Sequence, residues 1–319
     1  MDMDAPPVFI VGCERSGNTL LRLMLNRSPS IHIPSETYFL SRLADRQEVY
    51  GDFSLAHQRW FFIRDLQTNK ATSTTFTFPV FKLSIDEAED VLLKAAPTNY
   101  PGAAFALFEA AARKQGKKRW GDKTPRHVFD IQWLAETFPT AQIIHVIRDG
   151  RDVASSLLKA GWVSNFTEAA YYWQEKVQAG RKAGRALEKR RYCEVKYEQL
   201  VIDPERMLKH ICNWLNLTYI PEMLDPSATS VNYISGDWHL HRMVTRPVDA
   251  SRIYAWKTAL SLRQLANFEA VTEELLNELN YEVTGAKIPL WRASVREGIK
   301  KLRILEAESH KFLKKLEIH

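Results

Sequence analysis

The chain has 319 residues, of which 45% are hydrophobic and 26% charged, and these proportions are ordinary for a globular protein with a sizeable core. They exclude a disordered chain, and no apolar run approaches the roughly 18 residues that a membrane-spanning helix needs. The net charge of +6 and the pI of about 9.1 suit an anionic ligand, although solubility alone explains them equally well.

The cysteines and the first residues bear on the compartment. Cys13, Cys193 and Cys212 are odd in number, widely spaced and form no CxxC pair, which argues against a disulfide framework and against a zinc site. The opening MDMDAPPVFIVG is acidic and contains only a short apolar run, unlike a signal peptide. We therefore expect a cytoplasmic protein without a membrane span.

Short apolar runs rich in β-branched residues predict strands that are buried on both faces. Such runs occur at 8–12, 143–147 and 192–197. Helical patterns follow them at about 20–25, 152–160 and 204–215. The repeated order of strand, loop and helix predicts βαβ units and hence a parallel sheet.

The intervening segments are of several kinds. Residues 40–118 form a helical insertion with a polar loop at 67–79, and residues 225–256 lack periodicity and are expected to form a long functional loop. The segment 167–188 predicts an amphipathic helix with one apolar face, made of Ala170, Trp173, Val177, Gly184 and Leu187. The tail at 294–316 predicts a basic amphipathic helix that packs on the parent domain, with a dimeric coiled coil as the alternative.

A phosphate-binding loop follows the first strand. Residues 12–19, Gly-Cys-Glu-Arg-Ser-Gly-Asn-Thr, have the spacing of GxxxxGK[ST], with Asn18 in the lysine position. Backbone N–H groups of such a loop and the positive end of the next helix cradle a phosphate. The missing lysine argues against a triphosphate ligand. Arg15 places a bidentate guanidinium in the loop, which suits a terminal oxyanion.

At this point the motifs resemble those of PAPS-dependent sulfotransferases, where PAPS is 3′-phosphoadenosine-5′-phosphosulfate. Residues 15–20 resemble the 5′-phosphosulfate loop, and Arg148 to Arg151 after a buried strand, with Ser156 eight residues beyond Arg148, resemble the 3′-phosphate motif. Further similar segments are 120–125, 195–200 with Pro204, and 247–256. The order and spacing hold from residue 8 to about 285. The tyrosylprotein-sulfotransferase-like branch is the most similar, because its loop helix precedes a Glu-Thr pair, here Glu36-Thr37.

The resemblance implies a P-loop NTPase-like α/β fold, a three-layer sandwich with a central parallel sheet and helical insertions. It implies one sulfotransferase domain over 1–290, followed by the basic helix over 291–319. PAPS is then the donor and PAP, its desulfated product, the leaving nucleotide, with no metal required. The segments 40–118 and 225–256 are expected to shape the acceptor pocket.

The resemblance also assigns roles to residues. Glu36 becomes the general base, and Lys123, in an expected polar turn, and Arg15 contact the sulfuryl and bridging oxygens. The nucleotide-binding set is Arg15, Ser16, Gly17, Asn18, Thr19, Leu20, Arg148, Ser156, Tyr197 and Lys257. Alternatives remain: Glu36 as a helix-start residue, Arg151 as either a surface charge or a ligand, and His127 as a rival base. Assistance by His239 or His241 also stays open.

Three departures from the tyrosylprotein branch leave the acceptor open. Tyr38 stands where that branch has a basic residue two positions after the base. Its catalytic serine has no counterpart in residues 238–241, Trp-His-Leu-His. Ala255 replaces the lysine before the late tryptophan, although Lys257 follows directly. A small molecule, a carbohydrate, a lipid or a peptide therefore all stay possible as acceptor.

Two other function classes compete. A P-loop kinase predicts a lysine at position 18 and a Mg²⁺ site, and Asp149 alone hints at the second. A non-catalytic nucleotide-binding scaffold would use the basic C-terminal helix as its interaction surface. Nucleic-acid binding is not expected because the basic residues are spread out with no recognised module. A homodimer is left open.

Overall fold

The computed structural model describes residues 6–68, 78–227 and 250–287. The expected loop at 67–79, most of the loop at 225–256 and the expected C-terminal helix therefore lie wholly or largely outside the described residues. The domain boundaries proposed from the sequence stay predictions.

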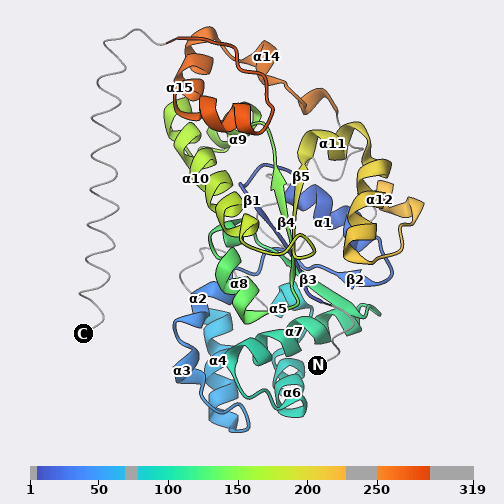
Figure 1. Cartoon of the computed structure of the whole chain (residues 1–319). Helices are drawn as coiled ribbons and strands as arrows, with labels where there is room; N and C mark the ends of the chain where they lie inside the picture. Colours follow the sequence, from blue (N-terminus) through green and yellow to red (C-terminus); the bar gives the residue numbers. More distant parts are fainter. Residues whose placement is uncertain (1–5, 69–77, 228–249, 288–319) are drawn as a thin grey trace, which may run out of the picture.

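A parallel sheet of five strands forms the centre of the molecule (Figure 1). Its strands are β1 (Val8–Gly12), β2 (Ile31–His32), β3 (Arg119–Lys123), β4 (Gln142–Ile147) and β5 (Tyr192–Lys196). They lie in the order β2-β3-β1-β4-β5, and all four neighbouring pairs are parallel. The chain therefore moves to one side of β1 for β3 and to the other side for β4. This reversal creates a switch point at the carboxyl end of β1, where ligands bind in such sheets.

The strand β3 corrects one expectation. The segment that contains Gly121, Asp122 and Lys123 was expected to form a polar turn, whereas these residues end a strand in which every residue is buried. Polar residues occupy this strand because its carboxyl end reaches the site described below. The aromatic ring of Trp120, in the same strand, stacks on Phe108 at 4.6 Å between centroids.

Side chains alternate between the two faces of β1, and each face is covered by helices. Val8 and Ile10 pack in one hydrophobic cluster with residues of α1 (Asn18–Asn26) and α12 (Pro204–Leu215). Phe9 and Val11 pack in another cluster with residues of α7 (Tyr100–Lys114) and α8 (Ile131–Thr137). The three-layer α/β architecture is therefore confirmed.

The remaining helices complete the layers. The segment between β2 and β3 is helical, as expected, and lies at the lower end of Figure 1. It contains α2 (Phe39–Ala44), α3 (Gln47–Tyr50), α4 (Ala56–Thr68), α5 (Phe78–Phe81), α6 (Ile85–Ala95) and α7. After β3 come η1 (Pro125–Phe129), α8, α9 (Gly150–Lys159), α10 (Phe166–Arg185), α11 (Tyr197–Ile202), α12, η2 (Pro221–Leu224), η4 (Ala250–Arg252), α14 (Trp256–Ala259) and α15 (Leu262–Glu278).

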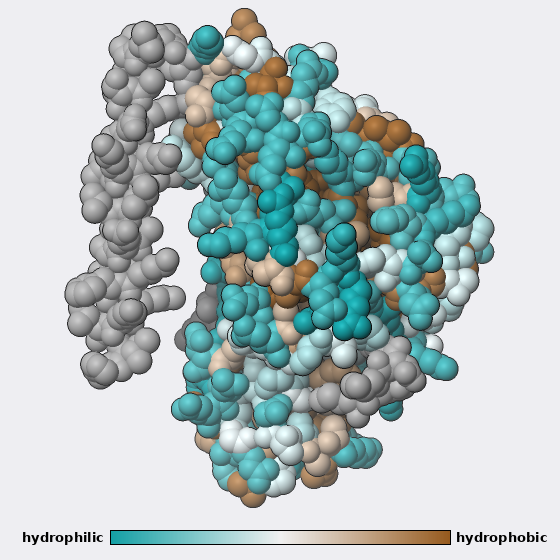
Figure 2. Space-filling model, in the orientation of Figure 1, coloured by the Kyte–Doolittle hydropathy of each residue, from teal (hydrophilic) through white to brown (hydrophobic). Residues whose placement is uncertain are grey.

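The amphipathic helix expected at 167–188 is α10, and its apolar face is confirmed. Ala170, Trp173, Val177 and Gly184 are buried, and Leu187, just past the helix end, is half-buried. The face seen in Figure 2 is mainly hydrophilic, with apolar residues scattered in small patches. Among the described residues, no helix is both long and apolar enough to cross a bilayer.

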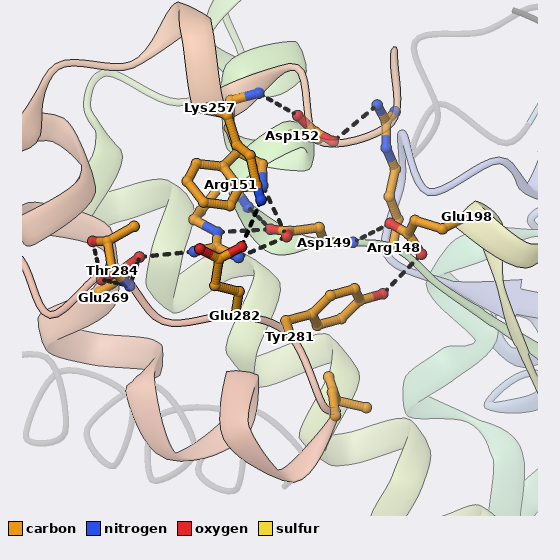
Figure 3. Close-up of polar contacts among 12 residues, drawn as sticks. Arg148, Asp149, Arg151, Asp152, Glu198, Lys257, Glu269, Tyr281, Glu282 and Thr284 are labelled. Atoms are coloured by element: carbon orange, nitrogen blue, oxygen red, sulfur yellow. Dashed lines mark hydrogen bonds and ion pairs between the residues drawn. The ribbon is translucent and has the colours of Figure 1, made fainter. Parts of the chain in front are cut away.

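Buried charges join the start of α9 to the C-terminal helices (Figure 3). The Arg151 side chain is 0% exposed and pairs with Asp149 and Glu269, at 2.8 Å each. Its guanidinium also lies 3.6 Å from the centroid of the Trp256 ring, whose N–H donates to Asp149. Arg151 was expected to be a surface charge or a ligand. The surface-charge expectation is wrong, because the side chain is buried and its Nε, Nη1 and Nη2 each donate to a carboxylate of Asp149 or Glu269. A contact with a ligand stays a prediction.

We predict that Arg151→Met lowers the free energy of unfolding by about 3–5 kcal/mol, because it leaves two buried carboxylates without their cation. The matched control is Arg185→Met, which removes an exposed ion pair to Glu278 and should cost at most about 1 kcal/mol. Urea unfolding of both variants measures the difference. Equal losses in the two variants would show that the Arg151 pairs do not hold the fold.

Candidate functional site

The candidate site lies at the carboxyl edge of the sheet, where the ends of four strands converge. Gly12 ends β1 and Lys123 ends β3, whereas Arg148 and Tyr197 directly follow β4 and β5. Parallel strands bring such residues to one edge although they are far apart in sequence. The sequence-predicted residues from four different segments therefore meet at this edge.

Two glycines shape the loop between β1 and α1. Gly12 has φ +147° and Gly17 has φ +99°, conformations that side chains rarely adopt. A Cβ on Gly17 would lie 2.4 Å from the ring of Tyr197, so the loop backbone packs directly against this tyrosine. Asn18, in the position of the missing lysine, donates its amide N–H to the Cys13 carbonyl at 2.9 Å. The asparagine therefore closes the loop on itself.

Two polar atoms of the site fit an anion. The Ser16 hydroxyl in the loop and Nε of Arg148 are buried, and neither has a hydrogen-bond partner within the part of the chain that the structure describes. Buried polar atoms without a partner are costly, so such atoms at a loop of this type point to a ligand. Both are donors, and a phosphate or sulfate oxygen accepts.

Several arginine side chains lie next to the same loop. Arg15 donates through Nε to the Ser156 hydroxyl at 2.9 Å, and Arg148 donates to the carbonyls of Arg15 and Arg252, at 3.2 and 2.8 Å. Burial lowers the pKa of Arg15, and the neighbouring charges of Arg148 and Arg252 lower it further. An anion bound among these guanidinium groups would relieve their repulsion. Arg252 was not singled out from the sequence, because its segment lacks periodicity.

A carboxylate and an ammonium lie next to the loop. Lys123 is 1% exposed, and its Nζ lies 2.5 Å from Oε1 of Glu36, whose side chain is 21% exposed. The same Nζ donates to the Thr19 hydroxyl at the start of α1, at 3.3 Å. The other carboxylate oxygen of Glu36 accepts from the Tyr38 hydroxyl. Since α2 begins at Phe39, Glu36 precedes the helix and is not one of its residues.

Hydrogen bonds to residues at the end of β3 fix the segment around Glu36. The Thr37 hydroxyl donates to Asp122 at 2.7 Å, and its backbone N–H donates to the Thr124 hydroxyl at 3.2 Å. Burial raises the pKa of Asp122. These contacts tie the segment after β2 to the end of β3, which carries Lys123.

His127, the rival base, is buried below this segment. Its Nδ1 lies 2.9 Å from Asp130, and its Nε2 lies 3.6 Å from Asp122. The ring thus lies between two carboxylates, of which only Asp130 is within hydrogen-bond distance among the described residues. A role for His127 as base stays a prediction. His239 and His241 lie outside the described residues.

A second group of charges beside the loop was missed from the sequence. Glu14, within the loop, pairs with Lys176 at 3.1 Å and accepts from the Tyr172 hydroxyl at 2.9 Å. Both partners belong to α10. A lysine on the otherwise apolar side of this helix was the available signal, because a buried lysine needs a partner.

The other expected residues lie as follows. Leu20 is half-buried and packs against the cluster under α1, so its side chain serves the core. Lys257 is half exposed and pairs with Glu282 at 2.5 Å. Its expected contact with the nucleotide stays a prediction. Among the described residues, no three His, Cys, Asp or Glu side chains are grouped as metal ligands.

Comparisons with known proteins identify a family and a fold. Residues 6–221 match a family model described as the sulfotransferase family. Protein-tyrosine sulfotransferase A of Caenorhabditis elegans is 22% identical over 87% of this chain and 68% of its own length. Protein-tyrosine sulfotransferase 1 of Danio rerio is 25% identical over 68% of this chain, which covers only 54% of that relative.

A solved structure shows the same fold. The sulfotransferase domain of the Synechococcus PCC 7002 olefin synthase superimposes with a TM-score of 0.61 at 24% identity, over 88% of this chain and 98% of that domain. The family model covers well over half of the chain and contains the loop, Glu36, Lys123 and Arg148. The chain belongs to the sulfotransferase family.

Proposed function

We propose that the protein transfers a sulfuryl group from PAPS to an acceptor hydroxyl and releases PAP. The observation that carries the proposal is the position of Lys123. This one buried cation contacts both Thr19, at the end of the phosphate loop, and Glu36. A sulfuryl donor bound on the loop would therefore lie close to the carboxylate of Glu36, since the Lys123 side chain contacts both the loop and that carboxylate. Membership of the sulfotransferase family supports the same reaction.

The two phosphates of the donor are assigned to two parts of the site. The loop 12–19 and the start of α1 would hold the 5′-phosphosulfate through backbone N–H groups and the Ser16 hydroxyl. Arg148 and Ser156 would hold the 3′-phosphate, for which the unpaired Nε of Arg148 is a suitable donor. Arg15 contacts Ser156 and therefore lies between the two parts.

We assign to Glu36 the role of general base, which takes the proton from the acceptor hydroxyl. Sulfuryl transfer, like phosphoryl transfer, needs the attacking and leaving oxygens in line and positive charge around the transferred group. Lys123 and Arg15 supply that charge. Glu36 is half-buried, keeps an exposed surface and has its carboxylate oriented by Lys123. A carboxylate in this position can take the hydroxyl proton as the acceptor oxygen attacks sulfur.

The acceptor class we propose is a phenol, such as that of a peptide tyrosine. Two relatives are named protein-tyrosine sulfotransferases, which supports this class. A kinase is disfavoured, since Asn18 closes the loop instead of reaching a γ-phosphate. The catalytic variants described below distinguish an enzyme from a non-catalytic scaffold, because only an enzyme would lose a transfer rate.

We predict that PAP binds at least about tenfold more tightly than ADP or 5′-AMP, because one charge-assisted hydrogen bond is worth roughly 1.5–3 kcal/mol. Calorimetry on the purified chain measures the three affinities. Ser156→Ala should reduce the preference for PAP, whereas Ser155→Ala, which removes a hydroxyl bonded to the Arg151 carbonyl, should not. Equal affinities for PAP and 5′-AMP would contradict the assignment of the 3′-phosphate.

We predict that Arg15→Ala and Lys123→Met slow turnover at saturating PAPS by about 10²–10³, because each removes a charge that stabilises the transferred group. Affinity for PAP should change much less. Lys117→Met is the matched control, since this half-buried lysine bonds to the Asn26 carbonyl away from the loop. Wild-type turnover in the Lys123→Met variant would remove Lys123 from the catalytic set.

We predict that Glu36→Gln lowers the transfer rate by about 10²–10⁴ while PAP affinity stays near wild type, because the amide keeps size and hydrogen bonding but is no base. Glu14→Gln, which changes the carboxylate within the loop, is the matched control and should keep the transfer rate within about tenfold of wild type. Single-turnover transfer and the melting temperature with PAP are measured together. If His127→Asn abolished transfer and Glu36→Gln did not, His127 would be the base.

A further inference from the structure

The nearest phenol to the proposed base belongs to the protein itself. The Tyr38 hydroxyl donates a hydrogen bond to the carboxylate of Glu36, the contact that an acceptor hydroxyl needs so that its proton can pass to the base as its oxygen attacks sulfur. This inference rests on the proposed function, in which Glu36 is the base.

A phenol bonded to a carboxylate is not unusual in this chain. Similar pairs join Tyr50 to Asp65, Tyr192 to Glu194 and Tyr281 to Glu198. Tyr38 differs because its carboxylate also holds Lys123, which in turn contacts Thr19 of the phosphate loop. Hydrogen bonds thus connect the loop, the lysine, the base and this phenol in one continuous series.

The backbone presents Tyr38 in an uncommon conformation. Tyr38 has φ +55°, in the left-handed region that bulky residues rarely adopt. The preceding Thr37 is bonded to both Asp122 and Thr124, so the backbone that carries Tyr38 is fixed beside the end of β3. Strained residues held by their surroundings in this way are concentrated at functional sites.

The surroundings of Tyr38 suit a sulfated product. The ring is half-buried, and the guanidinium of Arg42 lies 5.8 Å from its centroid. Lys123 pairs with the other carboxylate oxygen of Glu36. A sulfate ester formed on the phenol oxygen would carry a negative charge, which the positive charges of Arg42 and Lys123 near this residue would stabilise.

We propose that Tyr38 is a sulfation site of this protein's own active site. The phenol oxygen attacks the sulfur of PAPS, the bond from sulfur to the bridging phosphate oxygen breaks, and PAP leaves with that electron pair. The phenol proton passes to Glu36. The product is tyrosine O-sulfate at Tyr38, and the chain modifies itself when no external acceptor occupies the site.

The test is incubation of the purified full chain with sulfur-labelled PAPS and no acceptor, followed by intact mass measurement and peptide mapping. We expect one sulfuryl group per chain, on the peptide that contains Tyr38, formed at a first-order rate that does not depend on protein concentration. Tyr38→Phe should abolish the label. Glu36→Gln should slow labelling by about 10² or more while PAP still binds.

Two tyrosine controls sharpen the result. Tyr219→Phe, after α12, should leave labelling unchanged. Tyr172 is the rival phenol because it is bonded to Glu14 in the loop, so a label that is lost in Tyr172→Phe and kept in Tyr38→Phe would overturn the proposal. A rate that rises with protein concentration would also overturn it, since it would show transfer between molecules.

A parallel reaction with a simple phenol as added acceptor separates the two proposals. Transfer to the added phenol without any label on Tyr38 contradicts the self-sulfation and leaves the sulfotransferase function standing. Absence of PAP binding and of transfer to either acceptor contradicts both.

Discussion

The buried ion pair between Lys123 and Glu36 is the constraint on which the site depends. An ammonium that is 1% exposed needs a partner, and Glu36 supplies it at 2.5 Å. The pair requires β3 to end where it does and the segment after β2 to run across that end. Thr37, bonded to Asp122, fixes this crossing. The position of the proposed base Glu36 therefore depends on how β3 and the segment after β2 are arranged in the sheet.

Arginine side chains at the two edges of the sheet make different kinds of contact. Toward the amino edge, Arg119 donates to the Leu215 carbonyl at 2.5 Å and Arg191 donates to the Ala135 carbonyl at 2.9 Å. These carbonyls lie in the last turns of α12 and α8, so the arginines cap helix C-termini. At the carboxyl edge, Arg148 donates to the carbonyls of Arg15 and Arg252, and burial together with the neighbouring charges of Arg148 and Arg252 lowers the pKa of Arg15, which favours a bound anion there. A net charge of +6 therefore says less about ligand binding than the place of each cation does.

The sequence was informative where periodicity and spacing were strong. The strand at 8–12, the helix at 204–215 and the apolar face of α10 are found as predicted, because buried strands and amphipathic helices leave regular patterns. The strand β3 was not predicted, because Asp122 and Lys123 at its end interrupt the apolar run by which a buried strand is recognised. Arg151 was misjudged for a related reason, since a buried arginine is recognised only when its carboxylates, here Asp149 and Glu269, are known. The Lys123 contacts join segments far apart in sequence, and only the resemblance to a family could suggest them beforehand.

A crystal structure of the chain with PAP would show whether the loop, Arg148 and Lys123 form one preassembled donor site, as we propose. We expect the 5′-phosphate on the backbone N–H groups of residues 12–19 with the Ser16 hydroxyl, and the 3′-phosphate on Nε of Arg148; within the described residues neither of these two buried donors has a hydrogen-bond partner. A nucleotide bound away from this loop, or a 3′-phosphate directed into solvent, would show that these residues do not form the donor site.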